Sequence, residues 1–140
     1  MNNIISILLV EDDHVDIITI KRAFKDLKIT NPVEVCENGL QALDYLRDSK
    51  SPYPGIILLD LNMPKMNGLE FLQVIKNDQD LRMIPVVVLT TSKEEQNKIE
   101  SYSLGVAGYM IKPVDYLQFV DVIRTIHLYW TISELPEGKH

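Results

Sequence analysis

Cysteine is almost missing from this sequence, because Cys36 is the only one in 140 residues. A single cysteine cannot form an intramolecular disulfide, and it cannot supply the ligands of a cysteine-based zinc site. Cys36 ends the short stretch 33–36, where a cysteine usually serves as a small core residue. The sequence therefore excludes disulfide-stapled folds and cysteine-based zinc domains.

Positive charge and long apolar runs are also scarce. Lysine and arginine number 14 against 20 acidic residues, and the net charge of −6 argues against direct nucleic-acid binding. No apolar run approaches the length of a membrane span. The N-terminus enters the apolar run 4–10 directly, without the basic region of a signal peptide. We therefore predict a cytoplasmic protein that does not act on a membrane.

Apolar segments of two kinds alternate along the chain. Strand-like runs cover 5–10, 33–36, 56–59, 84–90 and 108–111. Helical spacings follow each run, with apolar positions at Ile17, Ile20, Phe24 and Leu27, at Leu40, Leu43 and Leu46, at Phe71, Leu72 and Ile75, at Ile99, Tyr102 and Leu104, and from Tyr116 to Trp130. This alternation predicts an α/β fold with a single doubly wound parallel sheet.

The stretch 56–68 is the most informative part of the sequence. Four apolar residues stop at Asp60, as in a strand buried on both faces. Pro64 and the Asn67-Gly68 pair then break the strand before a new helix. Open α/β sheets place their ligands at the carboxyl ends of strands, so Asp60 is a candidate site residue. Taken alone, Asp60 could equally begin a turn.

Three other strands also end in residues with useful chemistry. Glu11 and Asp12 follow the first strand, Thr90 ends the fourth, and Lys112 follows the fifth. These side chains converge with Asp60, because the carboxyl ends of parallel strands lie at one edge of the sheet. Clustered carboxylates need a cation, and oxygen ligands suit Mg²⁺. A lysine and a hydroxyl bind phosphoryl oxygens, so the cluster predicts phosphoryl transfer onto Asp60.

The same stretches carry a family resemblance. They read Leu-Val-Glu11-Asp12, Leu-Asp60-Leu-Asn-Met-Pro-Lys-Met-Asn-Gly68, Leu-Thr90 and Gly-Tyr-Met-Ile-Lys112-Pro. Each motif is weak alone, but in this order and spacing they resemble the receiver domain of two-component response regulators over nearly the whole chain. The resemblance implies a five-stranded (β/α)5 fold with the flavodoxin-like strand order 2-1-3-4-5.

The resemblance also assigns the acceptor and the metal site. Asp60 is expected to accept a phosphoryl group from a phosphohistidine of a sensor histidine kinase or a phosphotransfer protein. Asp12, Asp60 and the backbone carbonyl of Asn62 are expected to ligate Mg²⁺, with Glu11 acting through water. Glu11 departs from the aspartate that is commoner in the family, and its longer side chain still reaches the metal through water.

A switch is implied as well. Lys112 is expected to pair with Asp60 and then with the phosphoryl oxygens. Thr90 is expected to turn toward the phosphoryl group, and Tyr109 to follow it inward. The Lys112–Pro113 bond is expected to be cis, as in the family. By the same resemblance the protein is not an enzyme beyond its own phosphorylation and dephosphorylation.

Two other functions fit parts of the sequence. An aspartate-nucleophile phosphatase commonly needs a second acid two residues after the nucleophile, where this chain has Asn62. A degenerate receiver that only binds a partner remains the other alternative, although every expected site residue is present. Asp13 and Asp16 are interpreted as charges at a helix start, and His14 beside them is a weak catalytic candidate.

The partners are predicted from the end of the chain. Residues 1–130 are interpreted as the receiver and 131–140 as a tail, with no attached output domain, so the effect passes through a partner. The run 126–131 resembles stand-alone regulators that partner bacterial phytochrome kinases. Aromatic residues of that run, with Tyr102 and Tyr109, predict a homodimer through the fourth helix, the fifth strand and the fifth helix.

Overall fold

Strands and helices alternate along the part of the chain that the computed structural model describes, residues 5–132, with the backbone alone at 131 and 132. The strands are β1 (Ile7–Val10), β2 (Val33–Cys36), β3 (Ile56–Leu59), β4 (Val86–Thr90) and β5 (Gly108–Ile111). The helices are α1 (His14–Asp26), α2 (Gly39–Arg47), α3 (Gly68–Lys76), α4 (Glu95–Ser103) and α5 (Tyr116–Ile132). Apart from the last two residues of α5, the expected tail lies outside the described residues.

All five strands form one parallel sheet in the order β2-β1-β3-β4-β5. The α/β fold and the flavodoxin-like order are confirmed. Every residue of β1, β3 and β4 is buried, as expected for central strands that helices cover on both faces. The edge strands β2 and β5 are partly exposed. The three continuous apolar runs of the sequence are therefore the three central strands.

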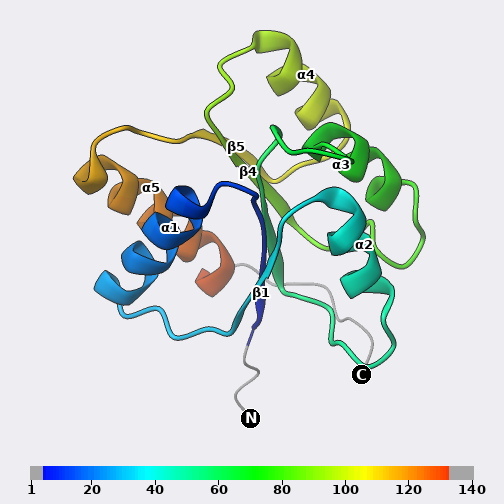
Figure 1. The fold of residues 1–140 in the computed structure, drawn as a ribbon, viewed down its shortest axis with the longest axis horizontal. Helices are drawn as coiled ribbons and strands as arrows, with labels where there is room; N and C mark the ends of the chain where they lie inside the picture. The colour runs from blue at the N-terminus through cyan, green and yellow to red at the C-terminus, as the bar shows by residue number, and fades with distance from the viewer. Residues whose placement is uncertain (1–4, 133–140) are drawn as a thin grey trace.

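Helices cover both faces of the sheet, with α1 and α5 on one face and α2 and α3 on the other (Figure 1). Successive strand residues point to opposite faces, so each strand contributes to two cores. One core joins Ile20, Phe24, Ile123 and Trp130 to Ile7, Leu9, Ile56 and Leu58. The other joins Leu43, Leu46, Phe71 and Leu72 to Leu8, Val10, Ile57 and Leu59. Each such side chain contributes about 1.5–3 kcal/mol, which makes the sheet a rigid support for the loops at its edge.

Short polar side chains begin the helices where the sequence indicates. Asp13 caps α1 by accepting hydrogen bonds from two backbone N–H groups of its first turn. Asn67 and Glu70 form a capping box at the start of α3. Asp115 accepts a hydrogen bond from the backbone N–H of Gln118 at the start of α5. Each cap contributes about 1 kcal/mol.

Two helices bury different side chains from those expected. In α4, Ile99 and Tyr102 are 54% and 48% exposed, and the buried residue is Ser101. In α2, Leu40 is 47% exposed, whereas Ala42 lies in the core. The three- and four-residue spacing identifies a helix, but packing against the sheet decides which of two adjacent faces turns inward. Because α4 buries so little apolar surface, we infer that it is among the least stable elements.

No described helix combines the length and the apolar character needed to cross a bilayer. The longest of these helices, α5, has 17 residues and carries the charged side chains Asp121 and Arg124.

Every peptide bond in the described part of the chain is trans, and this includes Lys112–Pro113. The cis bond expected there is wrong for this structure. The two isomers of a bond before proline differ by only about 0.5–1 kcal/mol. The surrounding loop, and not the dipeptide itself, therefore determines which isomer forms.

The helices α1 and α4 end in the same kind of turn. After each helix, two backbone N–H groups donate to carbonyls of the last turn in the Schellman pattern. The residue with positive φ is Gly105 after α4 (φ 91°) but Lys28 after α1 (φ 58°). A residue with a Cβ is strained in this conformation by about 1–2 kcal/mol. No glycine marks the end of α1, and the next turn-forming pair in the sequence, Asn31-Pro32, lies beyond the true end of the helix.

Replacing Lys28 tests this strain. Lys28→Gly is expected to stabilise the protein by roughly 0.5 kcal/mol, because the relief of strain exceeds the extra chain entropy of glycine. Gly105→Lys is expected to destabilise it by about 1–2 kcal/mol. Lys25→Gly, inside α1, is the control and should cost about 1 kcal/mol. Urea denaturation measures all three, and equal losses for Lys28→Gly and Lys25→Gly would contradict the interpretation.

Candidate functional site

The register of the sheet brings four functional side chains to one edge. Strands β1 and β3 pair in register up to Val10, so Glu11 and Asp60, the next residues, leave neighbouring strands side by side. The backbone N–H of Asp60 donates to the carbonyl of Val10 at 3.0 Å, and that of Lys112 to the carbonyl of Thr90 at 2.9 Å. Pairing thus continues one residue beyond the strands. Glu11, Asp60, Thr90 and Lys112 are all buried.

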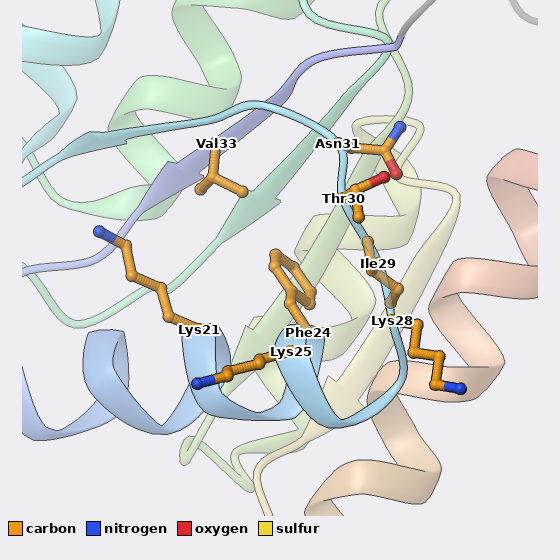
Figure 2. A pocket seen from close by; sticks show the side chains of 8 residues that line it. All are labelled: Lys21, Phe24, Lys25, Lys28, Ile29, Thr30, Asn31 and Val33. Atoms are coloured by element: carbon orange, nitrogen blue, oxygen red, sulfur yellow. The ribbon is translucent and has the colours of Figure 1, made fainter.

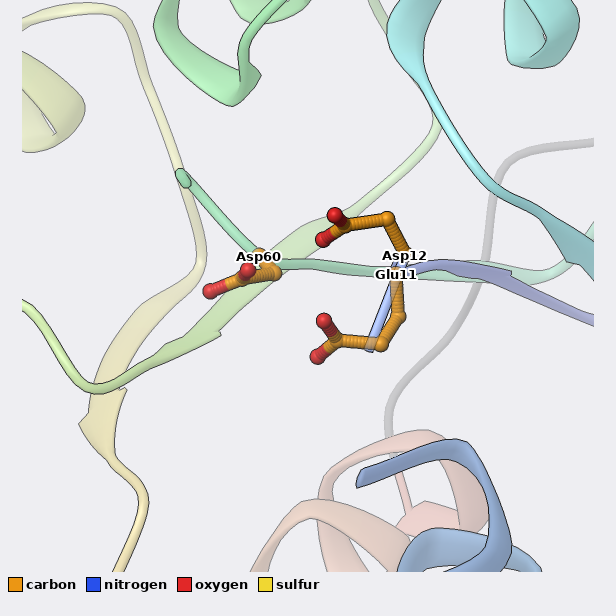
Figure 3. A group of neighbouring side chains, drawn as sticks. All are labelled: Glu11, Asp12 and Asp60. Carbon is orange, nitrogen blue, oxygen red and sulfur yellow. The ribbon is translucent and has the colours of Figure 1, made fainter. Parts of the chain in front are cut away.

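Glu11, Asp12 and Asp60 form an acidic cluster at this edge. One carboxylate oxygen from each lies within 4.8 Å of the others. Figure 3 shows Glu11 and Asp12 leaving the end of β1 in opposite directions, with Glu11 on the side of α1. Burial raises the pKa of Glu11 and of Asp60, and the negative charges of their carboxylate neighbours add to this effect. The cluster therefore requires positive charge.

Lys112 supplies one such charge from the end of β5. Its Nζ donates a hydrogen bond to Glu11 Oε1 and another, of 2.8 Å, to Asp16 Oδ2. Asp60 Oδ1 lies 3.7 Å from the same Nζ. This Asp60 oxygen is buried and accepts no hydrogen bond from any described residue. The expected pairing of Lys112 with Asp60 is thus present as a longer ion pair.

Burial determines the protonation of these groups. Burial raises the pKa of Glu11 to about 7, although the hydrogen bond and charge of Lys112 act in the opposite direction. Burial also raises the pKa of Asp60, again against the charge of Lys112. For Lys112, burial lowers the pKa, but hydrogen bonds to Asp16 and Glu11 outweigh it and leave the pKa raised. The Lys112 ammonium therefore stays charged, but this single positive charge does not offset the negative charges of the neighbouring carboxylates.

Thr90 and Tyr109 meet at the loop between β4 and α4. The Ser92 backbone N–H donates to Thr90 Oγ1 at 3.3 Å. The Tyr109 hydroxyl donates to the Ser92 carbonyl at 3.0 Å, and Asn97 Nδ2 donates to Ser92 Oγ at 2.9 Å. A movement at Thr90 therefore reaches Tyr109 through one short loop.

The loop between β3 and α3 is packed closely behind Asp60. A Cβ at Gly68 would lie 2.5 Å from the Asp60 carbonyl oxygen, so only glycine fits there. Lys65 in the same loop has a positive φ of 63°. Asn62, the expected carbonyl ligand, is exposed in this loop. The packing holds in place the backbone that carries Asp60.

Comparison with known families identifies the domain. Residues 7–124 match the response regulator receiver domain, a span that includes Glu11, Asp12, Asp60, Thr90 and Lys112. The chain belongs to this family. Receiver domains are signalling modules of two-component systems, so a general role in such signalling follows from the match.

The relatives of this receiver include light-signalling regulators. The probable methanogenesis regulatory protein FilR2 of Methanothrix harundinacea is 42% identical over 127 residues, 89% of this chain and 82% of FilR2. Response regulator Rcp1 of Synechocystis sp. is 39% identical over 128 residues, 89% of this chain and 87% of Rcp1. The phosphorylated cyanobacterial phytochrome response regulator RcpA superimposes with a TM-score of 0.90 at 36% identity, covering 96% of this chain and 100% of RcpA. The expected resemblance to phytochrome-associated regulators is confirmed.

The acidic cluster of this receiver fits a divalent metal. Its donors are all oxygen atoms, the ligands that hard divalent cations prefer. The buried Asp60 Oδ1 has no hydrogen-bond donor among the described residues, so it retains a free lone pair that can ligate a metal. The structure of Mn²⁺-bound Rcp1 superimposes on this chain with a TM-score of 0.86 at 38% identity, covering 94% of this chain and 98% of Rcp1.

Asp16 is a member of the receiver's site that the sequence did not indicate. It was expected to act only as a charge at a helix start, but its carboxylate reaches Lys112. Asp16 lies in the first turn of α1, and this turn adjoins the carboxyl edge of the sheet. That position is a signal from which its contact with Lys112 could have been predicted. Asp13 does cap the helix as expected. His14 is exposed and hydrogen-bonded to Glu37 at 3.2 Å, away from the cluster.

A cavity of about 600 Å³ lies between the end of α1 and the start of β2, at the end of the strands opposite the acidic cluster. It is lined by Lys21, Phe24, Lys25, Lys28, Ile29, Thr30, Asn31 and Val33. In Figure 2 the ammonium group of Lys28 points away from those of Lys21 and Lys25. The three lysines therefore do not converge on one anion.

The raised pKa of Glu11 predicts a pH dependence of stability. A carboxyl group whose folded pKa exceeds its unfolded value stabilises the fold below the unfolded pKa, and this contribution is lost as the pH rises through the folded pKa. For Glu11 the loss falls between pH 4.5 and about 7. It is on the order of 3 kcal/mol for a shift of this size.

Denaturant unfolding of the metal-free protein across this pH range measures the effect. The wild type is expected to lose stability with rising pH, and Glu11→Gln is expected to lose much less. Glu37→Gln, an exposed acid at the same edge, is the control and should follow the wild type. Parallel curves for the wild type and Glu11→Gln would show that Glu11 does not titrate in this way.

Proposed function

We propose that this receiver accepts a phosphoryl group on Asp60 from a sensor histidine kinase or a phosphotransfer protein. The observation that supports it most is the buried Asp60 Oδ1, which lacks a hydrogen-bond donor among the described residues and lies 3.7 Å from the Lys112 ammonium. A carboxylate oxygen with a free lone pair is a competent nucleophile. Rcp1 and RcpA, similar along most of this chain, are response regulators of the same family. The proposal includes a cytoplasmic location for the protein.

The transfer exchanges one bond for another at phosphorus. A carboxylate oxygen of Asp60 attacks the phosphorus of the phosphohistidine and forms a P–O bond. The P–N bond breaks, its electron pair stays on the imidazole nitrogen, and that nitrogen takes up a proton. Lys112 and Thr90 hold the phosphoryl oxygens of the product. The chain contributes chiefly position and charge, as is usual in phosphoryl transfer.

Mg²⁺ is the cation of this proposal. Asp12, Asp60 and the backbone carbonyl of Asn62 would hold it, and Glu11 would act through water. Bound there, the cation would offset the negative charge of the phosphoryl oxygens. Lys112 and the metal together then balance the surplus of carboxylates at this edge.

Turnover of small phosphoesters is not part of this proposal. A phosphatase of this kind needs a proton donor two residues after its nucleophile, and the amide of Asn62 cannot serve. The receiver instead catalyses only its own phosphorylation and dephosphorylation. Its signal passes to a partner when Thr90 turns to the phosphoryl group and Tyr109 leaves the Ser92 carbonyl. These movements change the face formed by α4, β5 and α5.

Intact-protein mass after incubation with acetyl phosphate tests the acceptor. A single phosphoryl adduct is expected in the presence of Mg²⁺, with little or none after chelation. Asp60→Asn is expected to abolish the adduct, because the amide is not a nucleophile. Glu37→Gln controls for the loss of one acid at the same edge and should label like the wild type. An adduct that survives in Asp60→Asn, or no adduct in the wild type, would contradict the proposal.

We also propose that the receiver forms a homodimer through α4, β5 and α5. Ile99 and Tyr102 of α4 and Leu128 of α5 are exposed apolar side chains of these elements. Trp130 is 2% exposed and packs edge-on against Phe24, as its place among the apolar positions of the helix predicts, so it does not contribute to the expected aromatic patch. The tryptophan turns inward because α5 presents that face to α1, so aliphatic residues and Tyr102 form the patch.

Sedimentation velocity tests the dimer. The wild type with Mg²⁺ and beryllofluoride is expected to sediment as a dimer. Ile99→Ser combined with Tyr102→Ser is expected to weaken the association at least tenfold, because a loss of about 1.4 kcal/mol of apolar contact is sufficient for a tenfold change in the dissociation constant. Met83→Ser removes an equally exposed side chain outside these elements and should leave the dimer intact. A monomer at all concentrations, with and without beryllofluoride, would contradict this interface.

A further inference from the structure

The ammonium group of Lys112 is shared between two sides of the site. On the side of α1 it donates a 2.8 Å hydrogen bond to Asp16 Oδ2. On the side of β3 it lies 3.7 Å from Asp60 Oδ1, beyond hydrogen-bond distance. The lysine therefore lies closer to a residue with no assigned role than to the expected acceptor.

The contact with Asp16 has the character of a strong ion pair. The Lys112 side chain is 5% exposed and that of Asp16 is 30% exposed, so solvent screens the pair less than it screens surface ion pairs. A charge-assisted hydrogen bond of this length is roughly twice as strong as a neutral one. Lys112 thus has a definite position in the unphosphorylated protein, which Asp16 and Glu11 determine together.

A phosphoryl group on Asp60 would compete for the same ammonium. It adds negative charge and several acceptor oxygens next to an oxygen that Lys112 already approaches. Lysine acts as a point charge on a flexible stem, so it can move between the two sides of the site. It cannot donate short hydrogen bonds to Glu11, Asp16 and two phosphoryl oxygens together, since an ammonium has three protons.

We propose that Asp16 is a positioning residue that holds the Lys112 ammonium on the α1 side of the site until a phosphoryl group on Asp60 draws it away. This inference rests on the proposed phosphorylation of Asp60. Asp16 then opposes the phosphorylated state. It also couples the first turn of α1 to the state of Asp60, since loss of the ion pair releases the side chain that ties this turn to β5.

Three variants separate this role from a general charge effect. Asp16→Asn removes the charge that holds Lys112, and Asp16→Glu keeps it. Glu37→Gln removes an exposed acid at the same edge that has no described contact with Lys112. The first readout is the rate at which acetyl phosphate and Mg²⁺ label Asp60. Asp16→Asn is expected to label about twofold to fivefold faster than the wild type, the change that follows from losing a partly exposed ion pair. Asp16→Glu and Glu37→Gln should label near the wild-type rate.

The second readout is the side-chain ammonium resonance of Lys112 in ¹H–¹⁵N NMR spectra. In the wild type it is expected to shift when Mg²⁺ and beryllofluoride bind. In Asp16→Asn the free protein should already show part of that shift, and the further change on binding should be smaller. A purely structural role of Asp16 would lower stability without moving this resonance toward the bound position.

Two results would overturn the inference. One is a labelling rate of Asp16→Asn equal to that of Glu37→Gln, with an unchanged Lys112 resonance. The other is the absence of any adduct on Asp60 in the wild type, which would overturn the proposed function as well. The two failures are distinguishable, because in the first case Asp60 still labels normally.

Discussion

The structure depends on the balance between one buried ammonium and a surplus of carboxylates at the carboxyl edge of the sheet. Lys112 contacts Glu11 and Asp16 and approaches Asp60, and these acids outnumber it. Burial makes the imbalance costly, as the raised pKa of Glu11 shows. This imbalance favours a bound cation, which together with Lys112 would offset the negative charge that phosphoryl transfer to Asp60 adds.

The rest of the fold holds these groups in place. The buried central strands end in register, so Glu11 and Asp60 cannot move apart without breaking backbone pairing of β1 with β3. Gly68 packs against the carbonyl of Asp60 and fixes the loop that follows. In contrast, α4 buries little apolar surface beside the Ser92 loop, where Thr90 and Tyr109 meet. A rigidly held Asp60 thus adjoins a weakly held helix, which suits a domain that converts a local charge change into a change of surface.

The apolar runs were sufficient for the convergence of the site, and the resemblance to receiver domains supplied the strand order. Continuous apolar runs that stop at Asp60 and Thr90 define central strands, and parallel topology alone then brings their ends together. The sequence was insufficient where two conformations have nearly equal local energy and tertiary packing determines which one forms. The exposure of Ile99 and the trans bond before Pro113 both depend on neighbouring elements. The contact of Asp16 with Lys112 joins residues 96 positions apart, and no local pattern records it.

A crystal structure of the protein with Mg²⁺ and beryllofluoride tests the charge balance between Lys112 and the carboxylates most directly. Our account predicts beryllofluoride on a carboxylate oxygen of Asp60, a cation held by Asp12 and Asp60, and the Lys112 ammonium within hydrogen-bond distance of a fluorine. It would be contradicted by a cation bound away from the acidic cluster, or by beryllofluoride absent from Asp60 while Lys112 keeps its present contacts.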